Sequence, residues 1–336
     1  MEGSWSRKAE KAAGPGLHKG PPPAPSRPPE SAQVLECLDG LGLEPLGGEV
    51  PFQTHNALFL PAKGRDGRPF LFKFYLSCPT GKFEQGLDPE GDCRRREAAF
   101  YRFLDVVDRD RVFLNVPRLV ITDQEDPPKW VLLEGIPGLK TAREEVPRPD
   151  WLLDSMRALQ KIPLRLTQGR RGLALERWDP YAHREVVLRM RDQVEPKVGP
   201  KAWDLLVRTL NEAREWTDSQ DPVLVNGDFQ DDSLLLDQDG RIYLQDFRRV
   251  GWGNPDHDLS WFWVGTTRDK EYRDQIFQLY CSSMGPSERT RVEWAIRSTA
   301  IYRACLDLAQ ARTPQEIAPA GELLERAILG GSYLFT

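Results

Sequence analysis

The chain has 336 residues, of which 51 are acidic and 46 are basic, so its formal net charge at pH 7 is −5. Nucleic-acid-binding domains normally carry a basic surface, and this balance argues against nucleic acid as a partner. No apolar run approaches the ~18 residues of a membrane-spanning helix, and the N-terminus lacks the apolar core of a signal peptide. The composition predicts a cytoplasmic protein with no membrane partner, and it leaves the oligomeric state unknown.

The cysteines and histidines show no metal-ligand spacing. The five cysteines are Cys37, Cys78, Cys93, Cys281 and Cys305, and the four histidines are His18, His55, His183 and His257. An odd number of scattered cysteines without a C-x-x-C pair predicts free thiols in a reducing compartment. We expect none of the histidines to bind a metal ion.

Residues 1–32 are rich in proline, glycine, lysine and serine. Such a segment buries too little apolar surface to offset its ordering entropy, which predicts a disordered tail. A transit peptide is the alternative, although Glu2, Glu10 and Glu30 are unusual in such segments.

The next part of the chain predicts a short helix over residues 34–43 and two strands over residues 52–60 and 70–76. Asp66 and Gly67 lie between the strands and are typical of a hairpin turn. No G-x-G-x-x-G sequence is present, so a phosphate-binding loop would have to come from residues 47–56. Residues 77–92 are rich in glycine, proline and aspartate and indicate an insertion.

Lys73 is the one charged residue in the strand over residues 70–76. A lysine in a buried strand needs an anionic partner or a route to solvent. The helix expected over residues 94–107 places Glu97 on its apolar face, so we expect the two side chains to pair. The alternative is that Lys73 reaches solvent and Glu97 is solvated. The arginines at positions 94–96 are interpreted as a solvated helix start.

Residues 130–138 predict a strand that is broken by Gly135 and Pro137. The rest of the chain is largely helical by its 3.6-residue periodicity. The expected helices cover residues 151–161, 181–192, 201–216, 269–284, 287–311 and 314–329. A proline and glycine interruption is expected at residues 196–200.

Residues 223–259 contain the strongest local pattern. Two strands, over residues 234–236 and 242–244, flank Asp239 and Gly240, which favour a two-residue turn with positive φ. That turn pairs Gln238 with Arg241 and so places Ser233 opposite Asp246. With Asp228 in the preceding loop, the three side chains meet at one end of the hairpin.

Two carboxylates in one pocket repel each other by about 4 kcal/mol at ~4 Å and an effective dielectric constant of ~20. Asp228 and Asp246 are therefore expected to bind a cation or to share a proton. A hard divalent ion such as Mg²⁺ is the natural partner of oxygen ligands. The alternative is that Asp228 caps a turn and Asp246 ends a strand, with no shared role.

This part of the chain resembles the catalytic and metal loops of the aminoglycoside phosphotransferase and choline kinase superfamily, which is related to protein kinases. The matching segments are residues 226–229 (NGDF), 234–236 (LLL), 245–247 (QDF) and 253–259 (GNPDHDL). The resemblance implies an α+β, two-lobed protein-kinase-like fold. Its N-lobe, a small antiparallel sheet with one helix, would span residues 33–136, and a larger helical C-lobe would span residues 137–336.

By the same resemblance, the protein would be an ATP- and Mg²⁺-dependent phosphotransferase acting on a hydroxyl of a small molecule such as a sugar, amino alcohol or aminoglycoside. Asp228 would be the catalytic residue. Apart from the resemblance, we expect Asp258 to cap the helix that begins at Leu259 instead of taking part in the chemistry. The remaining implied roles are nucleotide binding by Lys73, Glu97, Leu133, Glu134 and Ile136 and metal binding by Asp246 and Ser233.

Two positions depart from the family pattern. Ser233 stands where the family has a metal-binding asparagine, and a hydroxyl is a poorer ligand than a carboxamide oxygen. Asn226 replaces the usual histidine before the catalytic loop. Gln230, Asp231 and Asp232 are alternative metal ligands. A nucleotide-binding pseudokinase that serves as an interaction module is therefore the alternative function.

Two further sequence features bear on the function. A protein kinase is disfavoured because no His-Arg-Asp or Ala-Pro-Glu signature is present. Arg248 and Arg249 follow directly after Asp246 and Phe247, where the family is often acidic. They would favour a negatively charged acceptor.

Overall fold

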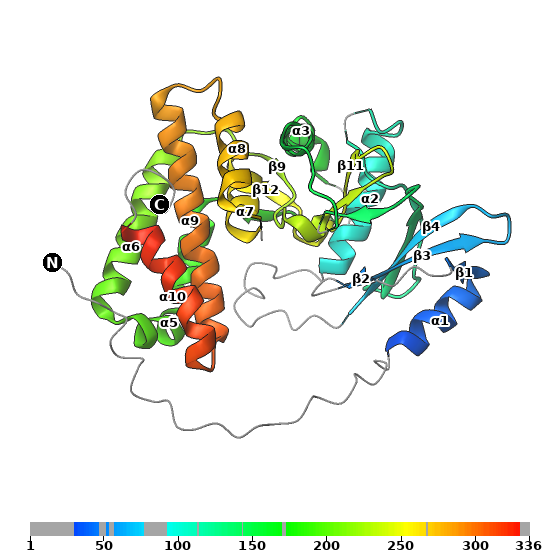
Figure 1. Ribbon diagram of the computed structural model, residues 1–336, viewed down its shortest axis with the longest axis horizontal. Helices are drawn as coiled ribbons and strands as arrows, with labels where there is room; N and C mark the ends of the chain where they lie inside the picture. Colours follow the sequence, from blue (N-terminus) through cyan, green and yellow to red (C-terminus); the bar gives the residue numbers. More distant parts are fainter. Residues whose placement is uncertain are drawn as a thin grey trace.

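The computed structural model describes residues 30–46, 52–53, 57–76, 93–112, 114–142, 144–169, 173–266 and 268–329 (Figure 1). Three expectations fall wholly or largely outside this part of the chain: the tail, the phosphate loop over residues 47–56 and the insertion over residues 77–92. Within the described residues, no helix is long and apolar enough to cross a membrane.

An antiparallel sheet forms the smaller lobe. Its strands follow the order β1 (Leu43–Pro45), β3 (Ala57–Gly64), β4 (Pro69–Tyr75), β6 (Trp130–Glu134) and β5 (Leu119–Thr122), and β2 (Phe52–Gln53) pairs with β3. The predicted turn between β3 and β4 is confirmed. Gly67 has a φ of +79°, and the Gly64 N–H donates to the Arg68 carbonyl at 2.9 Å.

Each face of this sheet is covered by one helix, because alternate side chains of β4 point in opposite directions. Phe72 and Phe74 pack with Val34 and Leu38 of α1 (Glu30–Gly40). Leu71 and Tyr75 belong to the core on the other side, together with the apolar face of α2 (Cys93–Val107). The resemblance implied one helix in this lobe, which is α2; α1 is an additional helix.

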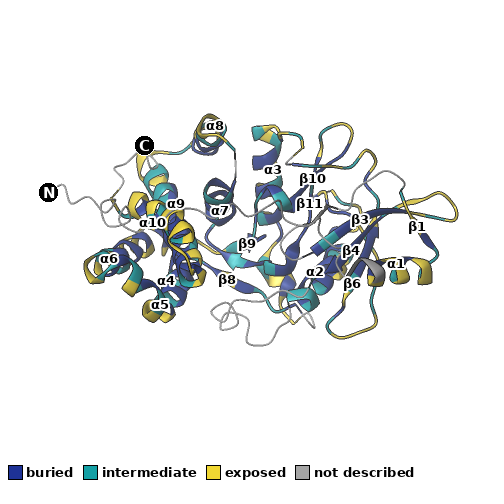
Figure 2. Cartoon of the chain, turned by 60° about the horizontal axis from the view of Figure 1, so that its bottom comes forward, coloured by how far each residue is buried: buried dark blue, intermediate teal, exposed yellow. Residues whose placement is uncertain are grey.

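The larger lobe is mainly helical, as predicted. Its helices are α3 (Pro149–Gln160), α4 (Pro180–Arg189), α5 (Arg191–Val198), α6 (Pro200–Thr217), α7 (His257–Gly265), α8 (Lys270–Tyr280), α9 (Pro286–Gln310) and α10 (Pro314–Leu329). α9 contacts α4, α6, α7 and α10, and the burial pattern in Figure 2 shows that the helices bury the faces they turn toward one another. The expected interruption near Pro196 occurs at Gly199, where φ is +87°.

Two small sheets lie between the helices and the N-lobe. In the first, β10 (Leu234–Leu236) pairs with β11 (Ile242–Leu244) and with β7 (Lys140–Thr141). In the second, β12 (Gly251–Gly253) lies between β8 (Glu176–Trp178) and β9 (Val223–Val225). Three short 3₁₀ turns accompany them: Leu164–Thr167, Asp231–Ser233 and Phe247–Arg249. The predicted site residues lie at the ends of these strands.

Candidate active site

The hairpin that carries the predicted site has a register one residue away from the predicted one. β10 and β11 have the predicted bounds, but Leu234 pairs with Leu244. The Gln245 N–H donates to the Ser233 carbonyl at 3.0 Å, so Ser233 lies opposite Gln245. The expectation that Ser233 faces Asp246 across the hairpin is therefore wrong.

The cause is the turn, which has three residues instead of two. The Asp237 N–H donates to the Arg241 carbonyl at 3.1 Å, in place of the predicted pairing of Gln238 with Arg241. The Asp237 carboxylate accepts hydrogen bonds from the Asp239 and Arg241 N–H groups, each at 2.9 Å. Only Gly240 needs a positive φ, of +77°. An aspartate that bonds the backbone two residues on stabilises this wider turn.

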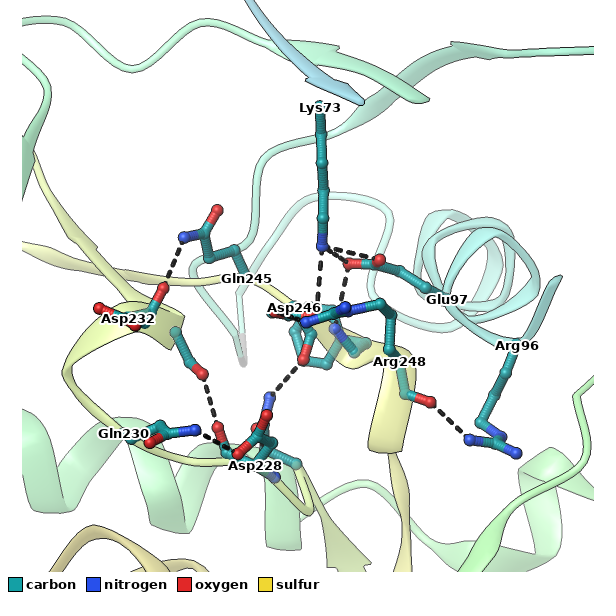
Figure 3. Close-up of polar contacts among 12 residues, drawn as sticks. Lys73, Arg96, Glu97, Asp228, Gln230, Asp232, Gln245, Asp246 and Arg248 are labelled. Carbon is teal, nitrogen blue, oxygen red and sulfur yellow. Dashed lines mark hydrogen bonds and ion pairs between the residues drawn. The ribbon is translucent and has the colours of Figure 1, made fainter. Parts of the chain in front are cut away.

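Asp228 lies at the predicted end of the hairpin and is half-buried. Its Oδ1 accepts hydrogen bonds from Gln230 Nε2 and from Trp261 Nε1, the second at 2.7 Å (Figure 3 shows the first). Gln230 therefore positions Asp228 through its amide N–H group. The contact of Trp261 with Asp228 was not predicted, because the two residues are 33 positions apart and no local pattern links them.

The Asn226 side chain supports the loop that carries Asp228. Its Oδ1 accepts from the Asp228 N–H at 3.1 Å, and its Nδ2 donates to the Asp246 carbonyl at 3.5 Å. One side chain thus links the two acidic segments. Asn226, the departure from the family histidine, therefore supports the loop.

Asp258 was expected to cap the helix after it, and this expectation is wrong. α7 begins at His257, one residue earlier. The Asp258 carboxylate reaches back and accepts from the Asn226 N–H at 2.9 Å and from the Gly227 N–H at 3.2 Å. Burial raises the pKa of Asp258 to about 7, although the two backbone hydrogen bonds lower it. Asp258 therefore braces the loop that presents Asp228.

Lys73 and Glu97 form the expected pair. Lys73 Nζ lies 2.8 Å from both carboxylate oxygens of Glu97, and both side chains are fully buried (Figure 3). Lys73 Nζ is also 3.3 Å from Asp246 Oδ1, and Glu97 Oε1 accepts from the Phe247 N–H at 3.1 Å. The alternative of a solvent-reaching lysine is wrong. β4, α2 and the end of β11 meet at these three side chains.

Asp246 has a left-handed backbone, with φ +63°, just before a 3₁₀ turn over residues 247–249. The turn brings Arg248 back onto Asp246, and its Nε and Nη2 donate to the two carboxylate oxygens. Burial alone would raise the pKa of Asp246, but Arg248 and Lys73 hold it well below its usual range. Asp246 in turn raises the pKa of Arg248, against the effect of burial. Asp246 is ionised, and both of its carboxylate oxygens accept hydrogen bonds from cationic side chains.

Arg96 was interpreted as part of a solvated helix start, but it is buried. It forms an ion pair with Glu176 and donates to the carbonyl of Arg248. Its Nε donates to the Ala174 carbonyl at 2.5 Å. Helical periodicity places Arg96 next to Glu97, but only the docking of α2 against the turn over residues 247–249 shows that it points inward.

The metal site that the resemblance implied does not fit this arrangement. Mg²⁺ binds through one or two carboxylates with near-octahedral geometry. Asp246 already accepts from Arg248 and Lys73, and the Ser233 hydroxyl donates to the Asp228 carbonyl at 2.5 Å. Asp231 accepts from the Thr266 hydroxyl at 2.9 Å. Among the described residues, no group of three or more His, Cys, Asp or Glu side chains is placed to hold a metal ion.

The strand expected to contact adenine is β6. Leu133 lies between β4 and β5 in the sheet, where it pairs with Leu71 and Leu119. The Glu134 N–H donates to the Arg118 carbonyl at 2.9 Å. Ile136 is buried just beyond the strand. Adenine contacts at Leu133, Glu134 and Ile136 stay a prediction.

Residues 65–294, more than half of the chain, match the model of the phosphotransferase enzyme family. The chain belongs to this family. A search of curated protein sequences gave no match. The described cysteines of this phosphotransferase family member, Cys37, Cys93, Cys281 and Cys305, form no disulfide with one another.

Solved structures of kinases share the fold of this family member. Choline kinase LicA from Streptococcus pneumoniae aligns with a TM-score of 0.57 at 11% identity, over 90% of this chain and 99% of that one. Plasmodium vivax ethanolamine kinase aligns with a TM-score of 0.57 at 13% identity, over 90% and 85%. A thermostable mutant of aminoglycoside phosphotransferase APH(4)-Ia, in a ternary complex with ADP and hygromycin B, aligns with a TM-score of 0.56 at 15% identity, over 89% and 99%. The protein-kinase-like fold is thereby confirmed.

Proposed function

We propose that the protein transfers the γ-phosphoryl group of ATP to a hydroxyl of a small molecule. The observation that carries this proposal is the meeting of Lys73, Glu97 and Asp246 from three elements, beside the Asp228 loop. Phosphoryl transfer depends mainly on positioning and charge stabilisation, and a fixed lysine and a fixed carboxylate supply both. Family membership supports the same reaction class.

In this proposal, Asp228 orients or deprotonates the acceptor hydroxyl. Its Oδ1 is held by Gln230 and Trp261, so the direction of the carboxylate is set before a substrate arrives. A positioned base contributes about 10²–10⁴-fold to a rate. Lys73 steadies the phosphates, and Glu97 orients Lys73.

The acceptor class follows by similarity alone. The relatives named above act on choline, ethanolamine or an aminoglycoside, and a macrolide 2'-phosphotransferase also shares the fold. We propose a hydroxyl-bearing small molecule of this kind, with adenine bound at Leu133, Glu134 and Ile136. The cytoplasmic location stays a prediction. The Mg²⁺ dependence implied by the resemblance is untested, and the contacts of Asp246 with Arg248 and Lys73 argue against it.

The test is a screen of small alcohols, amino alcohols and aminoglycosides for acceptor-dependent release of ADP. We expect at least one acceptor to stimulate release and Asp228→Asn to lower that rate by about 10²-fold or more. The matched control is Asp237→Asn, the same substitution at the other end of the same hairpin, which should retain the rate. ATP binding without any acceptor-dependent release would favour the pseudokinase alternative.

A further inference from the structure

Arg248 places a buried positive charge on the carboxylate that the resemblance assigns to a metal ion. Its guanidinium donates from Nε and Nη2 to the two oxygens of Asp246, and both side chains are about 95% buried, with relative exposures of 6% and 5%. A bidentate arginine–carboxylate pair is among the strongest charge-assisted hydrogen-bond arrangements. A metal ion at Asp246 would have to compete with Arg248, which donates to both carboxylate oxygens.

The backbone of Arg248 is held in place as well. The guanidinium of Arg96, on α2, donates to the Arg248 carbonyl. The Arg96 guanidinium also pairs with Glu176 of β8. Arg248 also lies within a 3₁₀ turn whose start is anchored by the hydrogen bond from Phe247 N–H to Glu97. Two neighbouring residues of α2, which is distant in sequence, therefore hold the backbone that carries the guanidinium, and Figure 3 shows the contact from Arg96. The fold therefore sets the position of Arg248 in the site.

The charges at this point already balance. Lys73 and Arg248 supply two positive charges, and Glu97 and Asp246 supply two negative charges. Burying a charge without a counter-charge is costly, so a balanced set is the stable arrangement. The net charge of this set therefore favours neither a divalent cation nor a nucleotide polyphosphate, and the choice between them depends on the groups presented: Asp246 already accepts from Arg248 and Lys73, and these two side chains are cationic donors.

We propose that Arg248 takes the place of the divalent ion, so that the site binds the polyphosphate of a nucleotide through Arg248 and Lys73 without a metal. Arginine suits this role because its planar fork matches phosphate oxygens and its charge does not depend on pH. The proposal rests on the proposed function, because it assumes that this site binds ATP.

The first test uses the unaltered protein. Calorimetric titration with ATP, in excess chelator and in excess Mg²⁺, should give dissociation constants that agree within about threefold. Binding that requires Mg²⁺ overturns the proposal but leaves the proposed function standing. The absence of ATP binding in both buffers overturns the proposed function and this inference together.

The second test removes the guanidinium. Arg248→Ala should weaken ATP binding in chelator by about 10–100-fold, the effect of losing a charge-assisted hydrogen-bond pair. Mg²⁺ should then restore binding, because Asp246 becomes available to a metal ion. Unchanged affinity in chelator, or no recovery with Mg²⁺, contradicts the proposal.

Two further variants keep this test decisive. Arg248→Lys retains the charge but loses the fork, and it should give an intermediate affinity in chelator. Arg291→Ala removes an arginine from a different buried aspartate, Asp256, which it contacts at 2.8 and 3.3 Å. It should leave the ATP affinity unchanged, so a general effect of breaking a buried ion pair is separated from a specific one.

Discussion

At the scale of single residues, the two oxygens of the Asp228 carboxylate have different surroundings. Gln230 and Trp261 both donate to Oδ1, which orients the carboxylate from one side. A base that is held in this way does not need to reorganise when the acceptor arrives. Trp261, from α7, is therefore a positioning residue for the proposed reaction.

Replacing Trp261 with Phe should keep most of the packing and remove the N–H donor. We expect kcat to fall by about tenfold, the typical effect of losing one hydrogen bond to a charged group, with KM for ATP unchanged. Steady-state kinetics of ADP release would measure this. Trp263→Phe on the same helix is the control, because the Trp263 ring stacks with Arg273 and should leave both constants unchanged. A change in KM alone would contradict the positioning role.

Asp258 predicts a dependence of stability on pH. Its pKa of about 7 in the folded protein lies above the ordinary value of ~3.9, so between these values the folded state holds a proton that the unfolded state has lost. The contribution of this bound proton to the free energy of unfolding is complete below pH ~4 and is lost as the pH rises to about 7. The wild-type protein should therefore lose up to about 4 kcal/mol relative to Asp258→Asn over this range.

Urea unfolding of both proteins at pH 5 and pH 8 would measure the part of this loss that falls between pH 5 and about 7, roughly 3 kcal/mol. A difference in unfolding free energy that stays the same at the two pH values would show that Asp258 is ionised throughout.

At the scale of elements, the hairpin shows what local sequence can and cannot predict. The apolar runs at 234–236 and 242–244 gave both strands with correct bounds. The register was wrong by one residue, because the Asp237 carboxylate competes for the N–H groups that a two-residue turn would leave to the strands. Short polar side chains near a turn determine the number of turn residues, and with it the register, through their hydrogen bonds. The periodicity of the strands contains no information about these bonds.

Gly227 and Gly240 have similar backbone conformations but different free space around them, so substitutions at the two positions distinguish backbone strain from steric clash. Gly227 and Gly240 have nearly the same φ, +80° and +77°. A Cβ at position 227 would lie 2.0 Å from the Arg249 carbonyl, whereas at position 240 the nearest atom, of Trp151, is 3.4 Å away.

Gly240→Ala should therefore cost only the left-handed strain of about 1–2 kcal/mol. Gly227→Ala should cost clearly more and should also lower the activity, because the Asp228 loop must shift. Urea denaturation and ADP-release assays of both variants would measure this, and equal losses of stability would contradict it.

At the scale of the whole molecule, the sheet of the smaller lobe and the strands of the larger lobe meet at one buried cluster of charges. Lys73 and Glu97 could be paired from the sequence, because a lone charge in an apolar strand and an acid on an apolar helix face each need a partner. The contacts of α2 with residues 246–248 could not, since about 150 residues separate them in the chain. The pairing of Arg248 with Asp246 was not predicted for a different reason: the direction of the arginine depends on the turn that follows the left-handed Asp246.

This cluster should contribute strongly to stability. Lys73→Met leaves Glu97 without its buried cation and Asp246 with Arg248 alone, and we expect it to lower the unfolding free energy by about 3–5 kcal/mol. Combining it with Glu97→Gln should cost less than the sum of the two single changes, because each removes the partner of the other. Lys140→Met, in the exposed pair with Glu145, is the control and should have little effect. Additive losses in denaturant unfolding would show that the pair does not act as a unit.

The central claim is that this cluster and the Asp228 loop form one phosphoryl-transfer site. Its most direct test is to follow the label of γ-labelled ATP in the presence of an acceptor that stimulates ADP release. We predict that the wild-type protein moves the label onto the acceptor hydroxyl and that Asp228→Asn, which still binds ATP, does so at least about 10²-fold more slowly. Transfer at the same rate by both proteins, or no labelled acceptor from the wild type, would contradict the account.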